Sequence, residues 1–105
     1  MNQDIIQLTY EKIMDLTDDE KSIMYLLFRV GKEVRIEAYT TGNRNLFMRN
    51  VKKAIKRMRT SGLEWYPSWN QISRAISKFE RVGLMKIDED GLPLWAYKEV
   101  NGIFS

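Results

Sequence analysis

The segment 65–100 restricts the fold of this chain more than any other part of its sequence. Apolar residues recur every three or four positions over Ser68–Val82, which predicts an amphipathic helix. Gly83 then provides a helix stop. Two short apolar stretches follow, Leu84–Ile87 and Leu92–Val100, and an acidic Asp-Gly turn joins them. The segment is therefore expected to form a helix that runs directly into a β-hairpin.

The expected 68–82 helix has two chemically different faces. At the 3.6-residue period of an α-helix, the apolar face collects Trp69, Ile72, Ala75, Ile76, Phe79 and Val82. The opposite face carries a polar row spaced i, i+4, i+7 and i+11, namely Asn70, Arg74, Ser77 and Arg81. Ser68 and Gln71 form a capping box at the start of this helix. A capped helix with a polar, basic outer face is a candidate binding surface.

Two further helices are expected upstream. Thr17 and Glu20 form a capping box that predicts a helix start, and this helix should end at Gly31. Alternating charged and apolar residues over 33–39 then indicate a half-buried strand. After a polar turn, a second helix is expected from residue 44 or 45 to residue 60.

The expected 17–30 helix is apolar on two sides, because Tyr25 and Phe28 lie nearly opposite its main apolar stripe. A helix of this kind must be covered twice. The core provides one cover, and the second is either the N-terminal segment or a second subunit. Residues 1–16 themselves fit either a short helix or an extended arm, since their apolar positions follow no clear period.

Composition excludes several classes of function. At 105 residues the chain is expected to form a single domain, 1–105, with its core over 17–100. It contains no cysteine and no histidine, which removes disulfides, the commonest general base and the commonest zinc ligand. No apolar run approaches the roughly 20 residues of a membrane span, and no signal peptide is visible. We therefore expect a cytoplasmic protein that is not an enzyme and uses no cofactor, metal or membrane.

The charges are unevenly distributed along the chain. Residues 21–62 hold eleven lysines and arginines against two acids, whereas residues 1–20 hold one lysine against six acids. In the expected 44–60 helix, basic residues gather opposite the apolar face: Arg49, Lys52, Lys53, Lys56 and Arg59. Like charges repel one another along a helix, and this cost is most easily tolerated where an anion binds. The distribution favours a polyanionic partner at one face of the protein.

The order of these elements resembles the winged helix-turn-helix superfamily, of the type found in small bacterial, plasmid and phage regulators. The stretch that carries the resemblance is Ile72-Ser-Arg-Ala-Ile-Ser-Lys-Phe-Glu-Arg-Val-Gly-Leu-Met-Lys-Ile87. The resemblance implies an α+β fold with a three-helix core, a C-terminal two-stranded β-hairpin wing and an extra N-terminal segment. The chain departs from the superfamily in an acidic wing tip over 88–90, a long basic second helix, and a long turn before the third helix.

This resemblance implies sequence-specific binding of double-stranded DNA, by a transcriptional regulator or a replication-associated factor. The apolar surplus at Tyr25 and Phe28, or in residues 1–16, is expected to pair two copies as a homodimer. The expected base contacts come from the third helix: Asn70, Gln71, Arg74, Ser77 and Lys78. The expected phosphate contacts come from the same helix and the one before it: Ser68, Arg49, Lys52, Lys53, Lys56 and Arg81.

Two other functions stay open. The acidic wing fits a protein-interaction module on the same fold, such as an inhibitor that acts through its acidic surface. Trp65, Tyr66 and Trp69 could instead stack on the bases of single-stranded nucleic acid. For these three aromatic residues, however, the expected place is in the core between the second and third helices.

Overall fold

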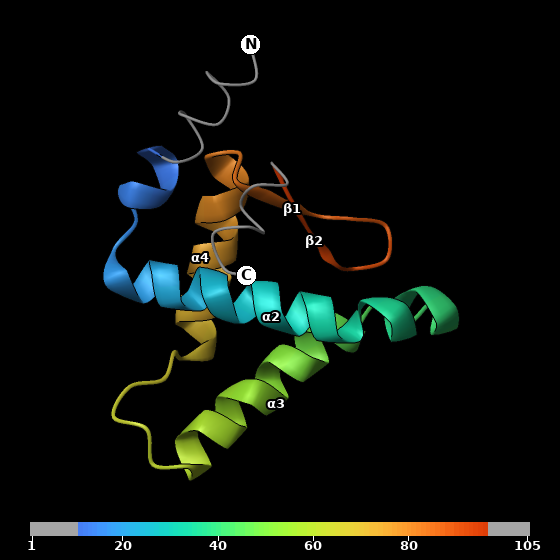
Figure 1. Cartoon of the computed structure of the whole chain (residues 1–105), viewed down its shortest axis with the longest axis horizontal. Coiled ribbons are helices and arrows are strands. Elements are labelled where there is room, and N and C mark those ends of the chain that lie inside the picture. The colour runs from blue at the N-terminus through green and yellow to red at the C-terminus, as the bar shows by residue number, and fades with distance from the viewer. Residues whose placement is uncertain (1–10, 97–105) are drawn as a thin grey trace.

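The computed structural model describes residues 11–96, which form helices and one two-stranded antiparallel sheet, an α+β arrangement. The longer helices are α2 (Asp18–Thr41), α3 (Leu46–Thr60) and α4 (Trp69–Arg81), and the strands are β1 (Met85–Ile87) and β2 (Pro93–Trp95). In Figure 1, α2 crosses α4, α3 slants below α2, and the hairpin extends from the upper end of α4. The element order of the described residues therefore places a short helical segment at 11–14 and three longer helices ahead of one hairpin.

Helix α2 is longer than the sequence indicates. Its predicted start is confirmed, because the Glu20 N–H donates to Thr17 Oγ1 (3.1 Å) and the Thr17 N–H donates to Glu20 Oε1 (2.8 Å). The predicted end at Gly31 and the predicted strand over 33–39 are wrong, since all of these residues are helical. The helix ends instead at Gly42, which adopts the left-handed conformation with φ 65°.

The spacing of the buried residues explains why this segment is helical. A strand would place Val34, Ile36 and Ala38 on one face. In the structure Val34 and Ala38 are 6% and 1% exposed, whereas Ile36 is 81% exposed. Val30, Val34 and Ala38 form one buried stripe, and their four-residue spacing is that of a helix. Packing against the core therefore favours a helix over residues 33–39, although their alternating pattern suits a strand.

The next two helices agree with the sequence. Helix α3 starts after Asn45 and ends at Thr60, as expected. Before α4, Ser68 Oγ accepts from the Gln71 N–H (3.1 Å), and Gln71 Oε1 accepts from the Ser68 N–H (2.8 Å), so the predicted capping box is confirmed. Three residues of the predicted apolar stripe are buried: Ile72, Ala75 and Phe79.

The core lies between α2, α3, α4 and the hairpin. All four contribute fully buried side chains: Met24, Leu27, Phe47, Val51, Ile72, Phe79, Leu84 and Leu92. Ile13 and Leu16 belong to the same cluster, and residues 11–14 are helical, while residues 1–10 lie outside the described part of the chain. On the second apolar side of α2, Phe28 is 9% exposed and Tyr25 is 41% exposed. Within residues 11–96, no helix has both the length and the apolar character needed to cross a membrane.

The hairpin forms where the sequence predicts it. Strands β1 and β2 pair antiparallel with Ile87 opposite Pro93. Asp88 holds the turn, because its Oδ1 accepts from the backbone N–H groups of Asp90 (2.9 Å) and Leu92 (3.0 Å). Within the described residues the return strand is shorter than the predicted Leu92–Val100, because Leu92 and Ala96 lie outside β2, and residues 97–100 lie outside the described part of the chain.

Gly31 serves a packing contact in the middle of α2. It is buried, and a Cβ atom added there would lie 2.8 Å from Pro93 Cγ and 3.1 Å from Pro93 Cδ. The proline ring is rigid, so it cannot turn away from such an atom. A glycine inside a helix costs about 1 kcal/mol relative to alanine. Here that cost allows β2 to approach α2 closely, which explains why a glycine stands inside the helix.

Replacing Gly31 by alanine should have opposite effects in two backgrounds. In the natural chain, we expect Gly31→Ala to lower the free energy of unfolding by about 1 kcal/mol, because crowding against Pro93 outweighs the gain in helix propensity. In a Pro93→Ala background, the same change should raise it by up to about 1 kcal/mol. Urea denaturation of the four proteins measures both effects, and an equal effect in both backgrounds would contradict the contact.

Candidate nucleic-acid interface

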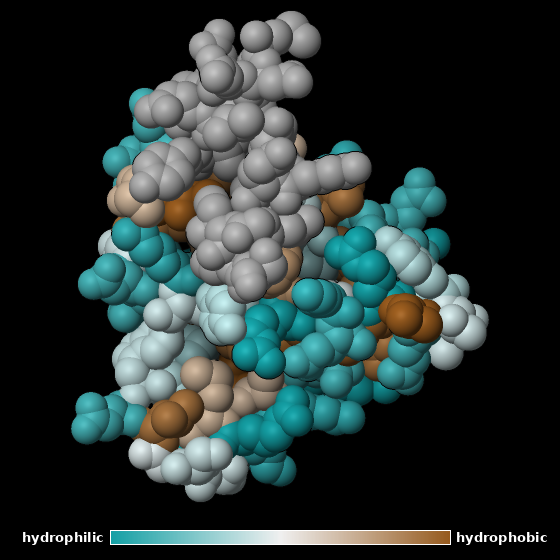
Figure 2. Space-filling view, viewed as in Figure 1, coloured by the Kyte–Doolittle hydropathy of each residue, from teal (hydrophilic) through white to brown (hydrophobic). Residues whose placement is uncertain are grey.

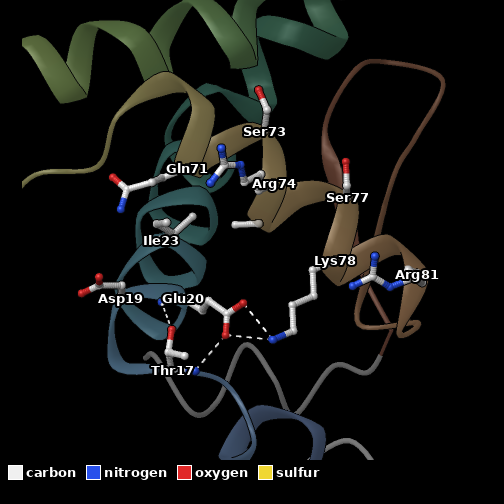
Figure 3. Close-up of a pocket in the computed structure, with 11 residues that line it drawn as sticks. Thr17, Asp19, Glu20, Ile23, Gln71, Ser73, Arg74, Ser77, Lys78 and Arg81 are labelled. Atoms are coloured by element: carbon white, nitrogen blue, oxygen red, sulfur yellow. Dashed lines mark hydrogen bonds and ion pairs between the residues drawn. The ribbon is translucent and has the colours of Figure 1, made fainter.

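The polar row of α4 is exposed along its whole length. Asn70, Arg74, Ser77 and Arg81 are all exposed, and the buried residues of α4 occupy the other side of the helix. Figure 3 shows Arg74, Ser77 and Arg81 following one another along α4. The predicted row is therefore a continuous polar surface that carries two guanidinium groups.

Lys78, which the sequence assigns to base contact, is held by α2. Its ammonium nitrogen lies 2.8 Å from Glu20 Oε2 and donates to Glu20 Oε1 at 2.9 Å. The Lys78 and Glu20 side chains are 33% and 20% exposed, in a groove between the start of α2 and α4 (Figure 3). The partners are 58 positions apart, so nothing in the local sequence indicates the pair. The structure thus gives Lys78 a partner within the protein.

Glu20 is held in its ionised form by its surroundings. The hydrogen bond from Lys78, followed by that from the Thr17 backbone, lowers the pKa of Glu20 below its ordinary value of 4.5. Glu20 thereby closes the cap of α2 and anchors α4 at the same time. Gln71, another predicted base contact, likewise has its side-chain oxygen in the cap of α4.

The outer face of α3 is basic, and no acidic side chain of this helix offsets its positive charge. Its cations are all exposed: Arg49, Lys52, Lys53, Lys56, Arg57 and Arg59. No acid occurs between Glu37 and Glu64, and in the described part of the chain none of these six side chains forms an ion pair. Such a cluster raises the local positive potential, which favours an anionic ligand at this face.

This basic face adjoins the N-terminal end of α4. The Lys52 ammonium lies 4.7 Å from the centroid of the Trp69 ring. Lys52 and Arg59 line a shared groove with Ser68, the residue that caps α4. The N-terminal end of a helix carries partial positive charge, so it continues the basic surface. The cations of α3 and the polar row of α4 therefore belong to adjoining surfaces.

The aromatic residues before α4 lie differently from the prediction. The sequence places Trp65, Tyr66 and Trp69 in the core, but they are 36%, 38% and 38% exposed, so this prediction is wrong. Pro67 is buried at this position instead. Trp69 stands in the first turn of α4, at the edge of the buried stripe, and Lys52 packs on its ring. Three partly exposed rings consequently border the basic surface.

The hairpin tip does not extend the basic surface. It carries three consecutive acids, of which Asp88 is turned inward as the hydrogen-bond acceptor of the turn. Glu89 is exposed at the tip. None of the cations that the sequence assigns to phosphate contact lies on the hairpin: they are on α3, and Arg81 is on α4.

The Glu20–Lys78 pair should contribute pH-dependent stability. Since folding lowers the pKa of Glu20, its contribution is complete above pH 4.5 and is lost as the pH falls from there through the lower folded-state pKa. At neutral pH, we expect Glu20→Gln to lower the free energy of unfolding by about 1 kcal/mol. This difference from the natural chain should shrink in acid, as followed by urea denaturation across pH 2–7.

Glutamine can still close the capping box, so this variant removes the charge and leaves the cap. Lys78→Met is the matched control, because Glu20→Gln should have little effect in its background. An equal loss of stability in both backgrounds, or a loss that does not change with pH, would contradict the role of the pair.

Searches against models of protein families, curated proteins and solved structures found no match to this chain. The function must therefore be argued from the surface itself. That surface consists of the polar row of α4, the acid-free face of α3, and Tyr66 and Trp69 in the groove between them, with Trp65 exposed in the same loop.

Proposed function

We propose that this protein binds double-stranded DNA sequence-specifically, as a winged-helix regulator or replication-associated factor. The observation that carries the proposal is the junction between the basic face of α3 and the capped end of α4. Helix α3 contains no acid, so a polyanion that lies along it meets only cations before the capped end of α4. The order of three helices and a hairpin also supports a winged helix.

In the proposed complex, α4 enters the major groove, which is wide enough for one helix. Arg74 can donate two hydrogen bonds to guanine, and Asn70 can make two with adenine. Ser77 lies in the same exposed row and can bond either kind of base edge. The row therefore offers three base-reading side chains on successive turns of the helix.

The grip on the phosphate backbone comes mainly from α3. Lys52 and Arg59 stand nearest the end of α4, and Arg49, Lys53 and Lys56 continue the charge along α3. Ser68 and Arg81 add contacts at the two ends of α4. Phosphate contacts supply affinity and orientation but little sequence information. In the proposed complex, α4 thus reads the bases and α3 holds the phosphate backbone.

Lys78 has a positioning role in this proposal. Its ion pair with Glu20 fixes α4 against the start of α2 and so sets the direction in which the polar row points. The acidic hairpin tip is a poor phosphate contact, so the wing stays off the DNA backbone. The proposed base-reading surface therefore lacks Lys78, which the sequence assigns to it.

The two classes of contact should separate in binding measurements. After selection of a target from a random DNA pool, we expect Arg74→Ala to weaken binding to that target by about 1–3 kcal/mol and to leave non-specific binding nearly unchanged. Lys53→Ala should weaken binding to all duplexes and reduce the slope of log Kd against log salt by about 1. Gel shifts over a salt series measure both effects.

Arg35→Ala is the matched control, because Arg35 is an exposed cation on α2, outside this surface. It should leave the affinity and the salt slope unchanged. The absence of binding to any duplex at low salt would overturn the proposal, and equal effects of Arg35→Ala and Lys53→Ala would remove the role of α3.

A second candidate is binding of single-stranded nucleic acid, which the exposure of Trp65, Tyr66 and Trp69 favours. Bases stack on such rings, and the Lys52 ammonium beside Trp69 can meet a phosphate.

For this candidate, oligo(dT) should quench the tryptophan fluorescence more than a duplex of equal length. The quenching should disappear when Trp65 and Trp69 are both replaced by phenylalanine. Trp95, which packs on Phe79, then serves as the internal control. Quenching that persists in the double variant, or that a duplex causes equally, would exclude the stacking role.

A further inference from the structure

A second groove lies between α2 and α3, on the flank of α3 away from α4. Its α3 wall contains Ala54, Arg57 and Met58, whereas Lys52 and Arg59 line the groove beside α4. On a helix these two sets project in different directions, with the core-facing Val51 between them. The groove has a volume of about 570 Å³, room for more than one side chain. Apart from Arg57, which also belongs to the basic face of α3, and Trp65 of the loop before α4, its lining is separate from the proposed DNA interface.

The floor of this groove is apolar. It is formed by Leu26 and Val30 from α2, Ala54 and Met58 from α3, and Trp65 from the loop. Figure 2 shows apolar side chains gathered between α2 and α3, with hydrophilic residues around them. Among the lining residues, Tyr25 and Trp65 are 41% and 36% exposed. Exposed apolar surface within a polar rim is typical of an interaction site.

The rim of the groove is mainly basic. Lys21, Arg29 and Arg57 stand around the floor, against the single acid Glu33. Glu33 is already paired with Arg29, whose guanidinium lies 3.8 Å from it. The rim therefore keeps an excess of positive charge. A matching occupant combines an aliphatic side chain with acids close beside it, and a phosphate backbone offers no such aliphatic group.

The hairpin of this same chain has that combination. Glu89 is exposed at its acidic tip, while Asp88 holds the turn in one conformation. Two aliphatic side chains flank the tip, Ile87 at 37% and Leu94 at 44% exposed. An acidic turn closed by hydrogen bonds, with one exposed aliphatic residue on each face of the hairpin, is complementary to a basic rim around an apolar floor.

We propose that the α2–α3 groove binds the hairpin tip of a second copy of this chain. Ile87 or Leu94 of one copy enters the apolar floor of the other, and Glu89 meets the rim at Arg57. The contact is heterologous, because it joins two different surfaces of the two copies. It gives the acidic wing a partner other than DNA, and it does not depend on the proposed DNA-binding function.

Charge reversal across the contact tests this proposal without any ligand. Sedimentation velocity of the full chain, from low to high micromolar concentration, should show a rising average mass that falls when salt is added. Arg57→Glu and Glu89→Arg should each weaken self-association by about tenfold or more. The chain that carries both changes should recover most of the loss, because each groove then meets a hairpin of opposite charge.

Two matched reversals serve as controls. Lys53→Glu lies on α3 outside the groove, and Glu37→Arg lies on α2 outside it, so both should self-associate as the natural chain does. Far-ultraviolet circular dichroism confirms that each variant is folded. The proposal would be overturned if the natural chain stays monomeric at every concentration. That result is expected if the groove binds another protein or a nucleic-acid strand instead. Failure of the double reversal to restore association would also overturn the proposal.

Discussion

The arrangement of the other elements depends on α2 remaining one helix through Gly31. That residue lies in the part of α2 where Pro93 packs, so the hairpin can approach α2 only where a side chain is missing. The same helix carries Glu20 near its start and Val34 and Ala38 in its second half, all in contact with other parts of the protein. Because α2 is continuous, it fixes α3, α4 and the hairpin relative to one another.

The sequence predicts best those features that depend on neighbouring residues. Both capping boxes, the bounds of α3 and α4, and the Asp-Gly turn follow from contacts within a few positions, and the structure contains all of them. The second half of α2 is different, because alternation over 33–39 suits a strand as well as a helix. Only burial of Val34 and Ala38 against the core, with Ile36 left in solvent, resolves that ambiguity.

The same distinction applies to the candidate site. The exposed row of α4 follows from helix periodicity, so the sequence locates it correctly. The Glu20–Lys78 pair and the exposed positions of Trp65, Tyr66 and Trp69 depend on how distant segments pack. A local pattern can show which side chains share a face. It cannot show that one of them is already bound by another helix.

The two proposed surfaces are compatible because they use different flanks of α3. A hairpin bound beside Ala54 and Met58 leaves Lys52 and Arg59 open at the other flank. Copies that associate through the α2–α3 groove could therefore each keep a basic face and an α4 row available for DNA. In the proposed assembly, binding of one copy to DNA raises the effective concentration of the next copy at an adjacent site. Weak contacts between copies would in this way strengthen DNA binding without adding any contact to the bases.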